Sequence, residues 1–348
     1  MTRLAALVVA ALAVACPSAG RTTTPPLARL VGQEIVTGIA GRTPGPWLLA
    51  RIRAGQVGGV LLFGRNIGSD ADVARLVGEL QAAAEAGGNP PLLVAVDQEG
   101  GAVERLPSGP PDLSPRDVGE TGSSAKAASE GGATAAYLRR LGIDVDLAPV
   151  LDTPSSPSSF LGSRAYSSDP ALNARLGSAF IGGLQRGGVA GTAKHFPGLG
   201  TARATTDTAA LVLRSPARVL ETGLLPFQRA IAGGVDLVMV SNAGYRAYDP
   251  TGTPASCSRA IVTGLLRRRL GFRGVVITDD LEAPGPQAQP DAPLEAARAG
   301  VDLLLYAHER TSAAGYNRLL AAARSGRLPP AELEASARRI AALKQKLS

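Results

Sequence analysis

Side chains able to act as acids, bases or hydrogen-bond partners follow several apolar segments of this chain. PLLVAVD ends at Asp97 and continues as QEGG, GVAGTAKHF carries Lys194 and His195 near its end, and GVVITDD ends at Asp279 and Asp280. A carboxylate beside a Lys or Arg side chain stays ionised, and an ionised carboxylate can act as a nucleophile or a hydrogen-bond acceptor. Core positions favour apolar residues, so we expect these polar groups to gather in one pocket.

Apolar segments of strand length alternate with amphipathic helical patterns from residue 30 onward. One amphipathic stretch opens with Asp70 and Asp72 and closes at Gly87, which are ordinary start and stop signals of a helix. The predicted strands are QEIVTG (33–38), GGVLLFG (58–64), PLLVAVD (91–97), DVDLAPV (144–150), GVAGTAKHF (188–196), DLVMVSN (236–242), GVVITDD (274–280) and VDLLLYA (301–307).

Continuous apolar strands between helices indicate a parallel sheet covered on both faces. Eight such units within roughly 300 residues fit an α/β fold, a single-domain (β/α)8 TIM-like barrel. A doubly wound sheet is the alternative, but the G-x-G-x-x-G turn of its best-known version is absent after the first strand. Active sites of barrels lie at the C-terminal ends of the strands, which is where the polar groups of this chain stand.

The composition is that of a protein with a substantial core. The chain has 348 residues, of which 45% are hydrophobic and only 4% aromatic, so Ala, Val, Leu and Ile must supply most of the packing. The net charge is +7, but the arginines are scattered and the densest cluster, Arg267 to Arg269, reads as a solvated helix end. A nucleic-acid interface would show a basic stripe with aromatics between, so we expect no nucleic-acid partner.

The N-terminus predicts export. MTRLAALVVAALAVAC has one Arg, an apolar run and small residues before Cys16, which is the pattern of a secretory signal. The AVAC ending resembles a bacterial lipobox, so we expect a signal peptide at 1–15, lipidation of Cys16, a flexible tether at 16–29 and the barrel at 30–348. The predicted location is the cell membrane, with the protein anchored by lipid and facing the cell wall. The alternative is an ordinary signal peptide cut nearby.

Metal and disulfide chemistry have few candidates. Cys257 is the only cysteine after Cys16, so the mature chain cannot form an internal disulfide. The two histidines, His195 and His308, with one cysteine exclude a zinc site of the Cys/His type. We expect neither a metal nor an organic cofactor.

Four blocks carry a resemblance to a known family: GGVLLFGRNI, VAVDQEGGAVERL, KHFPG and GVVITDDLE. In this order, at successive strand ends, they resemble glycoside hydrolase family 3, in its single-domain β-N-acetylglucosaminidase (β-N-acetylhexosaminidase) branch of exported bacterial lipoprotein type. The similarity runs from about residue 30 to about residue 310. It implies a retaining hydrolase acting on β-linked N-acetylglucosamine units of cell-wall or related glycan.

The resemblance also implies roles for single residues. Asp279, in the Thr-Asp pair that ends the seventh predicted strand, matches the nucleophile that forms the glycosyl-enzyme intermediate. The residues matching the sugar-contacting positions are Asp97, Arg105, Arg164, Lys194 and His195. For Arg105 and Arg164 the alternative is a salt bridge that braces a loop.

The loop after KHFPG departs from the family pattern. In the family that the chain resembles, this loop reads KHFPGHG and continues to an Asp-Ser-His group whose His is the acid/base. In this chain Leu199 stands in place of the His of KHFPGHG, and Thr205, Thr206 and Asp207 stand at the Asp-Ser-His positions. Either Asp207 acts as a carboxylic acid/base, as carboxylates commonly do in glycosidases, or the protein binds glycan without efficient turnover.

Smaller departures accompany this one. Ala102 replaces the Arg usual after the glycine pair, and Asn242 replaces the usual His after the sixth strand. His308 is the fallback acid/base, although a surface position is the better reading of it. The alternatives to a cell-wall glycosidase are a non-catalytic glycan-binding lipoprotein on the same scaffold and a barrel acting on another β-glycoside.

Overall fold

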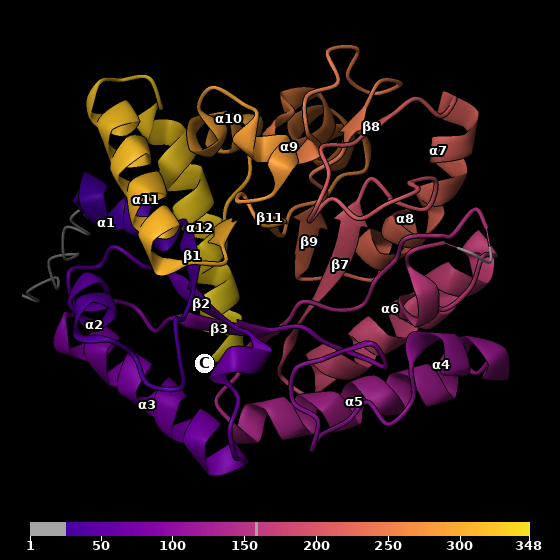
Figure 1. Cartoon of the computed structure of the whole chain (residues 1–348), viewed down its shortest axis with the longest axis horizontal. Helices are drawn as coiled ribbons and strands as arrows, with labels where there is room; N and C mark the ends of the chain where they lie inside the picture. The colour runs from indigo at the N-terminus through magenta and orange to yellow at the C-terminus, as the bar shows by residue number, and fades with distance from the viewer. Residues whose placement is uncertain (1–25, 157–158) are drawn as a thin grey trace, which may run out of the picture.

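Eight short parallel strands form a ring at the centre of the molecule, and helices surround it (Figure 1). The computed structural model describes residues 26–156 and 159–348, so the predicted signal peptide and Cys16 lie outside the described residues. In chain order the barrel strands are β1 (Ile35–Gly38), β2 (Gly59–Leu62), β3 (Leu93–Val96), β6 (Val145–Asp146), β7 (Ala190–Phe196), β9 (Leu237–Val240), β11 (Val275–Thr278) and β12 (Leu304–Tyr306).

The ring closes by parallel pairing throughout. The sheet order is β11-β9-β7-β6-β3-β2-β1-β12, and a parallel bridge between Ile277 and Leu303 joins its two edges. All eight predicted strands are present, and the single-domain (β/α)8 barrel is confirmed. The doubly wound alternative is wrong, because a doubly wound sheet keeps two open edges.

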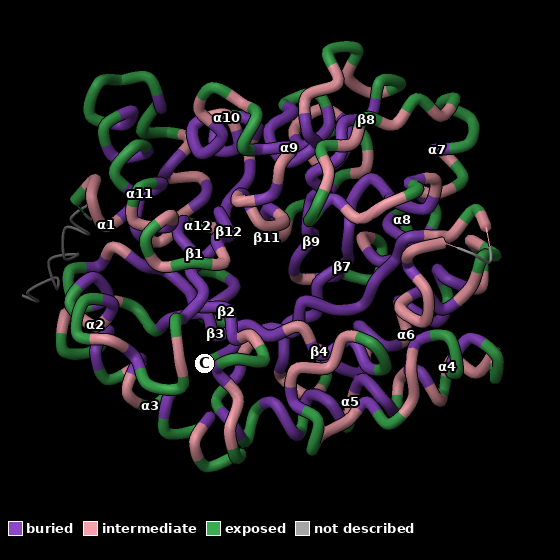
Figure 2. Tube along the Cα trace, viewed as in Figure 1, coloured by how far each residue is buried: buried purple, intermediate pink, exposed green. Residues whose placement is uncertain are grey.

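Helices cover the outside of the ring, with exposed residues on the outer surface and buried ones toward the strands (Figure 2). The helical segments are α1 (Leu27–Gln33), α2 (Pro46–Arg53), η1 (Gly64–Asn66), α3 (Asp70–Ala86), α4 (Pro115–Thr121), α5 (Ser124–Arg140), η2 (Gly162–Arg164), α6 (Pro170–Arg186), α7 (Ala217–Gly223), α8 (Leu225–Ala232), η3 (Ala255–Cys257), the π-helical η4 (Ala260–Arg269), α9 (Pro284–Gln287), α10 (Ala292–Ala299), α11 (Glu309–Arg324) and α12 (Pro330–Leu347). Within the described ranges, no helix is both long and apolar enough to cross a bilayer.

Two small pairings stand at the rim. The strands β4 (Gln98–Gly100) and β5 (Val103–Glu104) form an antiparallel hairpin directly after β3. The strands β8 (Val212–Leu213) and β10 (Gly244–Tyr245) pair in parallel and connect the loops after β7 and β9.

The apolar core has three large parts and a small fourth cluster of Val150, Leu161 and Ala165. Side chains inside the ring, such as Leu61, Leu147 and Met239, pack with Leu343 and Leu347 of α12, which crosses the N-terminal end of the barrel. Between strands and helices lie two further clusters, one drawn from residues 39–189 and the other mainly from residues 193–333. The interior is therefore filled at one end, and only the C-terminal end is free for ligand.

Three details differ from the expectations. The strand predicted at 144–150 is regular only at Val145–Asp146, because Pro149 offers no N–H to a ladder. Helix α1 begins at Leu27, inside the range given to the tether, since Leu30 and Val31 are buried against the barrel. Arg267 is not a solvated helix end.

Arg267 serves the fold instead. Its Nη2 lies 2.6 Å from Oδ2 of Asp302, a fully buried carboxylate at the base of the barrel, and its guanidinium donates to the carbonyl of Gly300. Arg268 and Arg269 are exposed, as predicted, and Arg269 forms a surface ion pair with Glu221.

Candidate active site

A cavity of about 290 Å³ opens at the C-terminal ends of the strands. The apolar side chains Leu61, Leu147, Met239 and Leu305, from the barrel interior, line part of it. All of the side chains predicted for the site line it as well, and they are Asp97, Arg105, Arg164, Lys194, His195, Asp207 and Asp279. The structure thus brings together residues that lie up to 182 positions apart, from Asp97 to Asp279.

A buried ion network joins the ends of β3 and β7. Nζ of Lys194 lies 2.7 Å from Oδ1 of Asp97 and 2.7 Å from Oε1 of Glu99. Arg164 binds the same Glu99 carboxylate with two donors, Nε at 2.8 Å and Nη2 at 2.9 Å. Burial alone would raise the pKa of Glu99, but the charges of Lys194 and Arg164 outweigh it and lower that pKa to about 2.

The same network keeps Lys194 charged. Burial lowers the pKa of its ammonium, and the two carboxylates raise it by more. Arg105 completes the group from the rim, with Nη2 at 3.9 Å from Oδ2 of Asp97. Asp97 is 14% exposed, so it is the carboxylate of the network that a ligand can reach.

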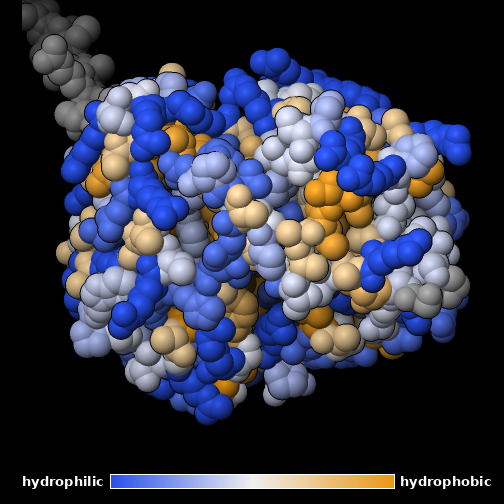
Figure 3. Space-filling model, turned by 45° about the horizontal axis from the view of Figure 1, so that its top comes forward, coloured by the Kyte–Doolittle hydropathy of each residue, from blue (hydrophilic) through white to orange (hydrophobic). Residues whose placement is uncertain are grey.

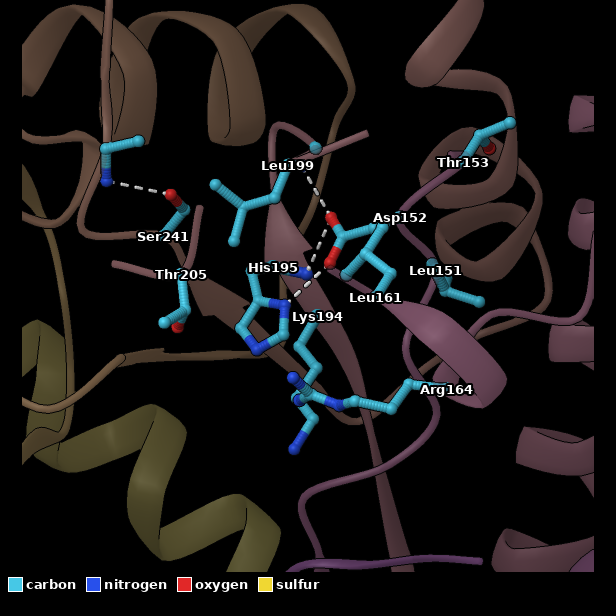
Figure 4. A network of polar contacts seen from close by, with 12 residues as sticks. Leu151, Asp152, Thr153, Leu161, Arg164, Lys194, His195, Leu199, Thr205 and Ser241 are labelled. Atoms are coloured by element: carbon cyan, nitrogen blue, oxygen red, sulfur yellow. Dashed lines mark hydrogen bonds and ion pairs between the residues drawn. The ribbon is translucent and has the colours of Figure 1, made fainter. Parts of the chain in front are cut away.

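His195 is oriented by Asp152, a fully buried carboxylate (Figure 4). Oδ2 of Asp152 lies 2.7 Å from Nδ1 of His195, while Oδ1 accepts the backbone N–H groups of His195 and Leu199. A carboxylate that accepts from Nδ1 places that ring proton and fixes the plane of the imidazole. The His195 side chain therefore presents its Nε2 edge as the group available to a ligand.

Asp279 stands directly after β11 in the cavity. Its Oδ1 accepts the N–H of Asp280, and its own N–H donates to the carbonyl of Val240 on the neighbouring strand. Burial raises the pKa of Asp279, the nearby His195 lowers it, and repulsion from Asp207 raises it, with a net upward shift. Asp207 lines the same cavity, so its negative charge acts on Asp279 across that space.

The loop that carries Asp207 is held against the strand ends. A Cβ added at Gly200 would lie 1.8 Å from the carbonyl oxygen of Thr153, so only glycine permits this approach. Beyond it, Thr205 donates its hydroxyl to Oδ2 of Asp207 and accepts the Asp207 N–H. Asp207 is exposed, whereas Leu199, at the position of the first departure from the family pattern, is buried beside the cavity.

Several site residues escaped the sequence prediction. Glu99 belongs to the QEGG segment quoted above, and Asp152 stands two residues after the fourth predicted strand, so their positions at strand ends were a usable signal. Asp280 and Glu282 also line the cavity. Burial raises the pKa of Asp280 to about 6, with repulsion from Glu282 and Asp279 adding to the effect.

His308 does not line this cavity. Its side chain is 68% exposed and its Nδ1 pairs with Glu282 at 2.5 Å, which places it on the surface and gives no support to its use as the acid/base. Asn242 braces the rim, because its Nδ2 donates to the backbone carbonyl of Asp280 and its Oδ1 accepts the hydroxyl of Ser256.

A parallel barrel with a carboxylate-rich cavity at the C-terminal strand ends is the arrangement of a (β/α)8 enzyme. The sequence matches the Glycosyl hydrolase family 3 N terminal domain over residues 48–343. The chain therefore belongs to glycosyl hydrolase family 3, and it is a glycosyl hydrolase.

Relatives cover nearly the whole chain. A protein described as an uncharacterized secreted glycosyl hydrolase from Arthroderma benhamiae is 36% identical, covering 92% of this chain and 94% of its own length. A Beta-hexosaminidase of Pseudomonas aeruginosa is 38% identical, with 77% of this chain and 82% of that protein covered.

Solved structures of related proteins have the same fold. The Beta-N-acetylhexosaminidase of Beutenbergia cavernae superposes with a TM-score of 0.84 at 35% identity, covering 92% of this chain and 98% of that one. A family 3 beta-N-acetylglucosaminidase from Paenibacillus sp. str. FPU-7 gives a TM-score of 0.89 at 36% identity, and there this chain spans 62% of the longer protein.

Proposed function

We propose that this protein hydrolyses β-linked N-acetylglucosamine O-glycosides of cell-wall or related glycan, with Asp279 as the nucleophile and overall retention of configuration. The observation that carries the proposal is that Asp279 and Asp207 line one cavity together with a charged network able to hold a sugar. Relatives described as beta-N-acetylhexosaminidases support the choice of N-acetylglucosamine.

The sugar-binding role falls to the network at β3 and β7. The carboxylate of Asp97 can accept two hydroxyl groups at once, and Lys194 can donate to another hydroxyl. Nε2 of His195 can accept a hydroxyl proton, because the ring proton lies on Nδ1 toward Asp152. The ring of hydrogen bonds within the network holds these side chains still before the ligand arrives, and preorganised groups bind with a smaller entropy cost.

The reaction then proceeds in two displacements. A carboxylate oxygen of Asp279 attacks the anomeric carbon as the bond to the leaving oxygen breaks, and the leaving oxygen takes a proton from an acid. Water, deprotonated by the same group acting as base, next attacks the anomeric carbon and releases Asp279. In retaining enzymes the two carboxyl groups stand about 5–5.5 Å apart, so the acid must lie on the cavity wall that faces Asp279.

We assign the acid/base step to Asp207, which stands in the loop after β7 whose sequence differs from the family pattern. Its side chain is exposed at the rim of the cavity in this structure. A bound leaving group would cover the loop and enclose the Asp207 carboxyl beside the glycosidic oxygen, the kind of sheltered position from which glycosidase acids act.

Asp207→Asn tests this assignment. For a β-1,4-linked N-acetylglucosaminyl disaccharide we expect kcat to fall by about 10²–10⁴-fold, the usual contribution of general acid–base help. A nitrophenyl N-acetyl-β-glucosaminide should lose far less in its glycosylation step, because an acidic phenol leaves without protonation. The acid limb of kcat/KM, which reports ionisation of Asp279, should move to lower pH once the repulsion from Asp207 is gone.

Other outcomes decide against Asp207. Disaccharide turnover that is unaffected by Asp207→Asn would show that the acid lies elsewhere in the cavity. If wild-type protein turns over neither substrate but binds N-acetylglucosamine, the protein is a glycan-binding member of the family, which is the alternative that the altered loop leaves open.

We also propose export and lipid anchoring through Cys16, on the strength of the N-terminal pattern alone. Expression of the whole chain in a bacterial host should place the protein in the detergent phase on phase partitioning, and Cys16→Ala should move it to the aqueous phase. If the wild-type chain and Cys16→Ala partition alike, the lipid anchor is contradicted. If Cys16→Ala is secreted, the N-terminus still acts as a signal peptide.

A further inference from the structure

A separate hollow of about 420 Å³ lies outside the barrel, where α9, α10 and α11 gather around the outer side of β12 (Figure 1). Leu305 of β12 points into the ring and lines the catalytic cavity, whereas the next residue, Tyr306, points to the helices and lines the hollow. Of the described residues, only Glu282 lines both spaces. We call this hollow, which Tyr306 and Arg318 line, the helix pocket.

The hydroxyl of Tyr306 is buried beside the helix pocket and has no hydrogen-bond partner within the described residues. The residue is only 4% exposed. A Cβ added at Gly315 of α11 would lie 2.1 Å from this oxygen, so glycine at that position gives the hydroxyl its place beside the helix. Because a buried hydroxyl without a partner is unfavourable, this group indicates a ligand that accepts a hydrogen bond.

Arg318 supplies a positive charge near this hydroxyl. It belongs to α11, is exposed, and makes no hydrogen bond or ion pair in the part of the chain that the structure describes. Burial raises the pKa of Tyr306, and the charge of Arg318 lowers it in part, which shows that the guanidinium acts on the hydroxyl. The two groups together can donate hydrogen bonds to one anion.

Glu282 is the single carboxylate among the described residues that line the helix pocket, and both of its oxygens are engaged. Its Oε1 accepts the N–H of His308 and the hydroxyl of Thr311, and its Oε2 lies 2.5 Å from Nδ1 of His308. Glu282 therefore does not pair with Arg318, and the guanidinium is left for a ligand.

Much of the remaining wall is apolar and stiff. Pro286, Pro290 and Pro293 line it, and proline rings have little conformational freedom. On the face of the molecule seen in Figure 3, hydrophilic surface predominates and hydrophobic groups gather in small patches. A hollow with apolar walls and a few polar groups is typical of a site for a small organic molecule.

We propose that the helix pocket binds a small organic anion, a carboxylate attached to a flat apolar ring. Arg318 and the hydroxyl of Tyr306 donate to the carboxylate, and the ring packs against the prolines. The ligand is not part of the glycan, because the pocket lies outside the ring of strands.

Benzoate and benzamide are matched probes, because they share the ring and differ in charge. Calorimetric titration of the whole chain should show saturable binding of benzoate, with a Kd about tenfold lower than that of benzamide, as expected for one charge-assisted contact. Inorganic phosphate, an anion without a ring, should bind more weakly than benzoate, because it gains nothing from the apolar wall.

Two variants locate the probe. Arg318→Ala should raise the Kd of benzoate about tenfold and leave that of benzamide unchanged. Tyr306→Phe removes only the hydroxyl and should also raise the Kd of benzoate about tenfold, the usual effect of losing a hydrogen bond to a charged group. Its melting temperature should not fall, since the hydroxyl has no partner to lose. Arg324→Ala, at an exposed arginine of α11 that does not line the pocket, is the matched control and should change neither Kd.

Several results would overturn the inference. The pocket is not a binding site if wild-type protein gives no heat of binding with millimolar benzoate. Equal Kd values for benzoate and benzamide contradict an anion site, and phosphate that binds as tightly as benzoate contradicts the role of the ring. A Kd for benzoate that neither Arg318→Ala nor Tyr306→Phe changes places the probe elsewhere. None of these results depends on turnover of a glycoside, so the proposed function stands or fails separately.

Discussion

Asp279→Asn is expected to lower kcat for a nitrophenyl N-acetyl-β-glucosaminide by about 10³-fold or more, because no covalent intermediate can form without the attacking carboxylate. The substitution keeps the size of the side chain and one oxygen able to accept the N–H of Asp280. The fold should therefore survive, and binding of N-acetylglucosamine should be retained. Steady-state kinetics with the aryl glycoside measure the loss of kcat, and a thermal melt shows whether the fold survives.

Asp291→Asn provides the matched control. Asp291 pairs with Arg327 and does not line the catalytic cavity, so turnover should stay within about twofold of wild type, as for surface changes in general. Wild-type turnover by Asp279→Asn would assign the nucleophile to another carboxylate, and Asp280, whose pKa is raised to about 6, would be the next to test.

Lys194→Met should cost about 3–5 kcal/mol of unfolding free energy at pH 7, the usual effect of removing one partner from a buried ion pair. Its ammonium is the cation that Asp97 and Glu99 share, and the variant leaves Glu99 in the interior with Arg164 alone. Denaturant unfolding followed by circular dichroism measures the loss. Sugar binding should weaken in the same variant, because Asp97 loses the group that holds it.

The sign of the pH dependence distinguishes this effect from simple loss of packing. The pKa of Glu99 is depressed to about 2, so its ion pairs stabilise the fold above the ordinary Glu pKa and lose that effect as pH falls toward 2. The difference between wild type and Lys194→Met should thus be largest near neutrality and shrink in acid. Arg338→Met, at an exposed pair with Glu334, should cost only about 0–1 kcal/mol. A constant difference across pH would attribute the loss to packing.

The barrel could be predicted because its signal is local and repeated. Each strand is an apolar run, each run is followed by a helix, and the strand-end rule alone placed Asp97, Lys194 and Asp279 in one pocket. Glu99 was within reach of the same reasoning, since side chains at i and i+2 of an extended segment point to the same side, as Asp97 and Glu99 do. The two-residue repeat of an extended segment and the position at a strand end are enough to place these side chains in the pocket.

Other features depend on contacts between distant segments. Asp152 is recognisable as a partner of His195 only once β6 and β7 lie side by side, and the partner of Arg267 is 35 positions away at Asp302. Trp47 and Arg310 line one hollow only because the first and last units of the barrel lie side by side. The spacing of these residues in the sequence does not predict such contacts.

The division of the outer core into two clusters has a consequence for how the molecule comes apart. Residues 39–189 and 193–333 are each packed mainly among themselves, so each can open as a cooperative unit with its own free energy, and hydrogen exchange would resolve the two. Asp97 belongs to the first unit and Asp279 to the second. Either opening event separates the two carboxylates, so heat inactivation should follow the weaker half of the barrel rather than its global unfolding.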